Sequence, residues 1–158
     1  MMRHLILITL FLQATLAMAQ PPITPDDAPI VVYQLQDDYE SIKSNLELAI
    51  TGRGMLISKT LHISEMFERT AADTGLTNNL YGKAESLEFC NIKLSHQMSS
   101  VHPANLSICP LTIGIYTLKS QPGELFLSYQ RPQMLGNATE AEAALIKLYE
   151  GIIREAME

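Results

Sequence analysis

The first part of the chain shows the residue periodicity of a strand and then that of an amphipathic helix. β-Branched and aromatic residues fill positions 30–35, a composition that predicts a strand. Asp37 or Asp38 can cap the helix that follows, in which apolar residues recur at steps of three and four. This apolar stripe consists of Tyr39, Ile42, Leu46, Ala49 and Ile50. Gly52 and Gly54 then favour the end of that helix.

A second strand and a second, shorter helix are predicted after these glycines. Apolar side chains alternate with others over residues 55–63, which predicts a strand with one buried face. The residues expected on the buried face are Met55, Ile57, Leu61 and Ile63, and those expected to face away are Leu56, Ser58, Thr60 and His62. Ser64 is expected to cap a helix that runs from Glu65 towards Asp73 and ends at Gly75.

The second half predicts three more strands and one long helix. Residues 86–92 form the first of these strands, and the weak pattern over 93–108 predicts a short helix or an irregular crossover. The segments 111–118 and 124–129 are β-like and joined by a Gln-Pro-Gly turn, which predicts an antiparallel hairpin. The last helix carries Ala141, Leu145, Leu148 and Ile152 at helical spacing, and Thr139 with Glu142, or Asn137 with Glu140, offers a capping box.

This order of elements predicts a single α+β domain over residues 30–157. Short turns join the later strands, so we expect a two-layer sandwich, with the helices packed on one face of a mostly antiparallel sheet. Prolines are frequent between residues 20 and 29, where they prevent regular hydrogen bonding and predict an extended, flexible leader.

Residues 1–19 have the pattern of a secretory signal peptide. Arg3 and His4 precede an uncharged apolar run over residues 5–16, and Ala-Met-Ala follows as a cleavage site. Cleavage would leave Gln20 as the new N-terminus. The alternative is an uncleaved anchor, but the apolar run is shorter than the ~20 residues that span hydrocarbon comfortably. We therefore expect a periplasmic or secreted bacterial protein without a transmembrane segment after cleavage.

Composition narrows the class of partner. Of the 158 residues, 47% are hydrophobic and 18% charged, which excludes a disordered chain or a coiled coil. The formal net charge of -6 argues against a protein that grips nucleic-acid phosphates. Two cysteines and no tryptophan leave little material for a multi-cysteine metal cluster or a stacking platform.

Export also determines how the two cysteines are interpreted. In an oxidising compartment, a structural disulfide between Cys90 and Cys109 is the expected state of this pair. A redox-active pair is the alternative, although catalytic dithiols usually stand as Cys-x-x-Cys beside a helix N-terminus. A two-thiolate metal site is a third possibility, and it requires reduced sulfur.

The sequence lacks the standard enzyme signatures, namely an HExxH pair, a Gly-x-Ser-x-Gly elbow and a phosphate loop, so no catalytic activity is expected. The remaining candidate for chemistry is a group of imidazole and thioether side chains. His96, Met98 and His102, completed by His62, could bind copper or haem if the fold brought them together. The alternative is that Met98 fills the core and the histidines are ordinary polar residues.

Tyr129 and Arg131 form a second candidate site. They stand at the end of a predicted strand, where they could point into a ligand pocket or toward a second chain. The alternative is an exposed hairpin exit at which Pro132 stops the ladder.

Four short blocks of the sequence lie at residues 88–90, 105–110, 112–118 and 127–132. Together they resemble the DUF302 family, most closely its exported, cysteine-containing branch. The resemblance covers approximately residues 32–156. It implies a small TT1751-like α+β sandwich and a compact, often dimeric domain of uncharacterised function. It supplies no agreed set of catalytic residues, and the cluster at His96, Met98 and His102 is not part of the family pattern.

We therefore expect an exported, non-catalytic accessory domain that binds a small ligand or a protein partner without a cofactor, with a homodimer as one candidate assembly. The alternatives are a periplasmic copper or haem protein that uses the histidines, and a thiol–disulfide redox protein that uses the cysteines.

Overall fold

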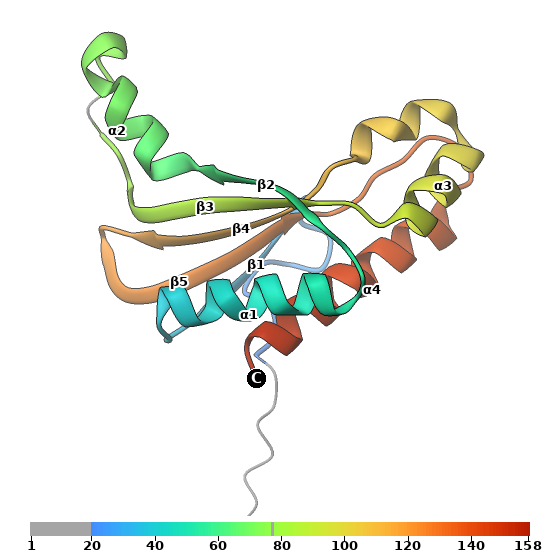
Figure 1. The fold of residues 1–158 in the computed structure, drawn as a ribbon, viewed down its shortest axis with the longest axis horizontal. Coiled ribbons are helices and arrows are strands. Elements are labelled where there is room, and N and C mark those ends of the chain that lie inside the picture. The colour runs from blue at the N-terminus through green and yellow to red at the C-terminus, as the bar shows by residue number, and fades with distance from the viewer. Residues whose placement is uncertain (1–19, 77) are drawn as a thin grey trace, which may run out of the picture.

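The computed structural model describes residues 20–76 and 78–158, so the expected signal peptide lies outside the described residues. Figure 1 shows the fold. Its elements are β1 (Ile30–Leu35), α1 (Tyr39–Gly52), β2 (Ile57–His62), α2 (Ile63–Thr74), β3 (Tyr81–Phe89), α3 (Ile92–Val101), the 3-10 helix η1 (Pro103–Ile108), β4 (Leu111–Leu118), β5 (Gln121–Gln130) and α4 (Thr139–Ala156). No helix of the described residues is both long and apolar enough to cross a membrane.

The five strands form one sheet in the order β1-β5-β4-β3-β2. Every neighbouring pair is antiparallel, and β4 and β5 form the predicted hairpin. Its turn is made by Lys119 and Ser120, however, and the predicted turn residues 121–123 already belong to β5. Strand β1 lies beside β5, far from it in sequence, so the first and last strands of the chain are neighbours. The expected α+β class is therefore confirmed.

Helices α1 and α4 lie side by side over one face of the sheet (Figure 1). The stripe predicted for α1 is buried except for Tyr39, which is half-buried, and Leu145 and Ile152 bury the matching face of α4. Each large aliphatic side chain buried in this way contributes about 1.5–3 kcal/mol. Burial of these apolar side chains therefore holds α1 and α4 against one face of the sheet.

Strand β2 differs from the prediction in which residues face the helices. The register with β3 shifts between Ile57 and Lys59, and His62 then stands opposite Glu85. A bulge places two residues against one, so it exchanges the faces of all residues that follow it. Leu61 therefore faces away from the helices, while His62 lies on the helix-covered side.

The capping predicted for α2 is wrong. Helix α2 follows β2 directly, and the hydroxyl of Ser64 is buried, where it accepts a hydrogen bond from the backbone nitrogen of Ala84 at 3.1 Å. Gly75 ends the helix as predicted, with φ of 69°. Helix α2 lies beyond one end of the sheet, and α3 lies beyond the other (Figure 1).

The weakly patterned segment over residues 93–108 is largely helical. The preceding strand ends at Phe89, and Asn91 caps α3 by accepting from the backbone nitrogen of Leu94 at 3.1 Å. Asn105 then organises the turn, because its buried amide bonds the carbonyl of Met98 and both backbone groups of Leu135. Hydrogen bonds of a buried polar residue therefore hold this segment in place, and the weak hydrophobic pattern did not indicate them.

Neither capping box predicted for α4 forms. Glu142 accepts a hydrogen bond from the backbone nitrogen of Met134 at 2.7 Å, and Ala138, at the N-cap, makes no side-chain cap. The carboxylate therefore ties the preceding loop to the helix instead of closing its first turn.

The leader at residues 20–29 is hydrogen-bonded to the domain. The backbone nitrogen of Ile23 donates to Val32, and the hydroxyl of Thr24 accepts from the same residue. Ile23 and Thr24 thus bind both backbone groups of Val32 in β1, and the ordered part of the chain extends upstream of Ile30.

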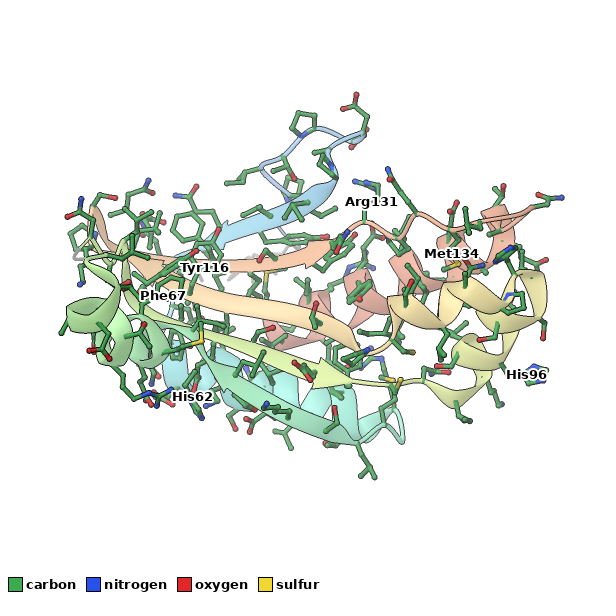
Figure 2. All side chains as sticks on the ribbon, turned by 90° about the horizontal axis from the view of Figure 1, so that it is seen from above. His62, Phe67, His96, Tyr116, Arg131 and Met134 are labelled. Carbon is green, nitrogen blue, oxygen red and sulfur yellow. The ribbon has the colours of Figure 1, made fainter. Side chains whose placement is uncertain are left out.

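Four aromatic side chains form a row that begins on α2 and crosses the open face of the sheet, and Figure 2 labels two of them, Phe67 and Tyr116. Phe67 of α2 lies 6.1 Å from Tyr81, Tyr81 lies 5.6 Å from Tyr116, and Tyr116 stacks on Phe126 at 5.1 Å between ring centroids. The chain has few aromatic residues, and the fold places four of them next to one another in this row.

Candidate functional site

A cleft of about 520 Å³ opens beside the end of β5. It is lined by η1, the strand β4, the segment after β5 and α4. The lining residues are Ser107, Ile108, Pro110, Thr112, Gln130, Arg131, Pro132, Gln133 and Tyr149. Ligand sites commonly occupy 300–1,000 Å³, so a small molecule fits this volume.

Arg131 is held in the cleft wall by the leader. Its Nε donates to the carbonyl of Ala28 at 3.0 Å, and its backbone nitrogen donates to the carbonyl of Pro29 at 2.8 Å. These bonds anchor the near side of the guanidinium. Neither bond uses the two terminal nitrogens of the guanidinium, which carry most of the N–H donors of an arginine.

Tyr149 of α4 supplies a neutral phenol to the same cleft. Its oxygen accepts a hydrogen bond from the backbone nitrogen of Thr112 at 3.3 Å. Burial raises the pKa of Tyr149 to about 12, against a smaller opposing effect of the Thr112 bond. The phenol therefore keeps its proton, and its oxygen can donate as well as accept.

The structure separates Tyr129 from Arg131, although the sequence suggested that both could enter one pocket. Tyr129 is only 2% exposed and stacks on Tyr149 with ring centroids 4.5 Å apart. It lies on the helix-covered face of β5, whereas Arg131 follows the end of that strand. Only Arg131 lines the cleft.

The hydroxyl of Tyr129 has no hydrogen-bond partner among the described residues. We expect Tyr129→Phe to leave the free energy of unfolding unchanged or to raise it by up to about 1 kcal/mol, because the desolvation penalty of an unpaired group is removed. Tyr149→Phe is the matched control, since it deletes a bonded hydroxyl in the stacked partner and should cost about 1 kcal/mol. Urea denaturation of both variants measures the difference, and an equal loss in the two would contradict the assignment.

The predicted cysteine pair is brought together at the edge of this cleft. The sulfurs of Cys90 and Cys109 are 2.9 Å apart as thiols, farther than the ~2.05 Å of a disulfide bond but near enough that a small shift would join them. The hydroxyl of Ser95 lies 3.1 Å from the Cys109 sulfur. Burial, together with the hydrogen bond to Cys90, raises the pKa of the Cys109 thiol.

The structure does not bring together the four residues suggested for copper or haem. His62 and His96 lie at opposite ends of the domain (Figure 2). Met98 is 1% exposed and belongs to the core, while the ring of His102 accepts from the backbone nitrogen of Ala104. Positions two apart on a helix point in different directions, which separates His96 from Met98. Within residues 20–76 and 78–158, no group of three His, Cys, Asp or Glu side chains is arranged to hold a metal ion.

Sequence reasoning missed a buried acid at Glu85 of β3. Its carboxylate lies 2.8 Å from the Lys43 ammonium, 2.6 Å from Nδ1 of His62 and 3.1 Å from the hydroxyl of Tyr39. Burial opposes ionisation, but the hydrogen bonds from Lys43 and Tyr39 outweigh it and hold the pKa of Glu85 below its usual value. The cluster joins α1, β2 and β3. One signal was available, because Glu85 precedes the buried Leu87 and Phe89 at the spacing of a single strand face.

Two of three comparisons with known proteins found a match. The sequence model of the family described as "Domain of unknown function DUF302" matches residues 31–157. The fold is similar to the crystal structure of an uncharacterized conserved DUF302 protein from Bacillus stearothermophilus, with a TM-score of 0.65 and 14% sequence identity, over 81% of this chain and 98% of the other. Comparison with curated proteins gives no match. Since the family match spans most of the chain, this protein belongs to the DUF302 family.

Proposed function

We propose that this protein is an exported, non-catalytic accessory domain that binds a small molecule in the cleft beside Arg131. The observation that carries the proposal is the cleft itself, whose polar groups come from separate parts of the chain. Arg131 and Gln133 follow β5, Thr112 lies in β4, and Tyr149 lies in α4. Convergence of a few polar groups in a concave site of this size is typical of ligand binding.

The chemistry of the lining favours recognition. The guanidinium of Arg131 is permanently charged, and the phenol of Tyr149 stays protonated because its pKa is raised to about 12. Hydroxyl groups of Ser107 and Thr112 and the amides of two glutamines complete the polar set. These groups can donate and accept hydrogen bonds, as the recognition of a polar ligand requires.

The cysteine pair supports the proposed ligand binding by a structural role, because a bond between the two sulfurs would stabilise the cleft. Cys109 stands between Ile108 and Pro110, which both line the cleft, so a bond to Cys90 would fix that wall. The raised pKa of Cys109 makes it a poor leaving group in thiol exchange, which favours a stable bridge over a redox centre. The proposal therefore includes a periplasmic or secreted location, where the bridge can form.

Amide NMR of the protein with a panel of neutral, acidic and basic fragments tests the proposal. We expect at least one fragment to produce saturable shifts at Thr112 and Arg131. Gln133→Trp should abolish these shifts by filling the cleft, while Gln121→Trp, an exposed control at the start of β5, should keep them. The proposal fails if no fragment shifts these amides saturably, or if Gln133→Trp binds as the unaltered protein does.

A further inference from the structure

We propose that the ligand of this cleft is a small, polar organic acid with a single carboxylate, bound through Arg131. The inference rests on the proposed function, because it names the class of molecule that the same cleft takes. It follows from the charges, the free donors and the apolar wall that the lining presents.

The charge of the cleft is opposite to that of the whole protein. The chain has a formal net charge of -6, yet the lining holds one guanidinium and no carboxylate. Among the ion pairs of the described residues, none involves Arg131, whereas Arg53, in another part of the surface, is paired with Glu155. A cation without an acidic partner in a concave site leaves its countercharge to be supplied by a ligand.

The donors available to that ligand match a carboxylate. Nε of Arg131 is occupied by Ala28, so the planar terminal nitrogens are the ones left to meet an incoming pair of oxygens. The phenol of Tyr149 accepts from Thr112, which leaves its own proton to be donated. Charge-assisted hydrogen bonds from an arginine to a carboxylate are among the strongest in proteins.

The rest of the cleft indicates the body of the molecule. Ser107 donates its hydroxyl to the carbonyl of Ala104 at 3.0 Å, so its oxygen can accept from a ligand hydroxyl. The amides of Gln130 and Gln133 can donate and accept, and Ile108 and Pro110 offer apolar surface to carbon atoms. A second negative charge would find no second cation in this lining, which disfavours dicarboxylates and phosphate.

Calorimetric titration of the full protein with three probes tests the inference. The probes are gluconate, which is a hydroxylated monocarboxylate, its neutral analogue gluconamide, and inorganic phosphate. We expect gluconate to bind at least about tenfold more tightly than either of the others, since only gluconate offers the single carboxylate that Arg131 can pair with through charge-assisted hydrogen bonds. Arg131→Gln should weaken gluconate binding by about tenfold or more, while Arg69→Gln, the same charge change on exposed α2, should not.

Each contrary outcome is distinct. Equal binding of gluconate and gluconamide, or of gluconate and phosphate, would overturn the monocarboxylate class and leave small-molecule binding intact. Equal losses in Arg131→Gln and Arg69→Gln would overturn the role of Arg131. Binding of basic or neutral fragments in the cleft without gluconate binding would likewise remove the inference, whereas an absence of any fragment in the cleft would defeat the proposed function itself. The comparison of probes on the unaltered protein holds even if Arg131→Gln folds poorly.

Discussion

Glu85→Gln is expected to lower the free energy of unfolding by about 2–3 kcal/mol at neutral pH. Removing one member of a buried ion pair usually costs about 3–5 kcal/mol, because the remaining charge loses its partner. The expected loss is smaller here, since the side chains of Lys43 and His62 are 20% and 50% exposed and water screens them. Urea denaturation measures the change. Glu88→Gln, on the same strand but the opposite face, is the control and should be nearly neutral.

The same variant should alter the response to acid. The folded protein holds the pKa of Glu85 below its ordinary value of 4.5. A depressed carboxyl pKa contributes stability that is fully present above the unfolded value and is lost as the pH falls through the folded one. The unaltered protein should therefore lose stability more steeply than Glu85→Gln below about pH 4.5. Parallel curves for the two proteins in that range would contradict the assignment of Glu85 as an ionised partner of Lys43.

Reduction of exported protein is expected to lower the free energy of unfolding by about 3 kcal/mol, the chain-entropy value for a loop of roughly 20 residues. The reason is that a bond between Cys90 and Cys109 restricts the unfolded chain while joining two sulfurs that the fold already places together. Denaturation curves with and without reductant measure the loss. The double variant Cys90→Ser/Cys109→Ser should be insensitive to reductant. Two free thiols in unreduced exported protein would refute the bridge.

Elements whose stability comes from hydrophobic burial could be predicted from the sequence. The stripe through Leu46 and Ile50 identified α1, and the β-like composition of residues 111–118 identified β4. Gly75 indicated the end of α2, because its positive φ suits a residue without a side chain. In these cases local periodicity and tertiary burial favour the same structure.

Elements determined by polar contacts over long distances could not be predicted in the same way. The bulge in β2 reversed the faces expected for Leu61 and His62, because pairing with β3 decides the register. Asn105 holds η1 through bonds to residues distant in sequence. Hydrophobic periodicity contains no information on such contacts.

The candidate site was only partly foreseen. The sequence pointed to Arg131, and the structure places it in the cleft, but its neighbour there is Tyr149 rather than Tyr129. Tyr149 lies in α4 and reaches the site only because that helix packs under the sheet (Figure 1). Its part in the cleft depends on tertiary packing that no local pattern encodes.

A crystal structure of the full protein grown with saturating gluconate tests the central claim most directly. The account predicts electron density for one gluconate in the cleft, with its carboxylate within hydrogen-bond distance of the Arg131 guanidinium and of the Tyr149 hydroxyl. A cleft closed by its own side chains, or a gluconate bound elsewhere on the protein, would contradict it.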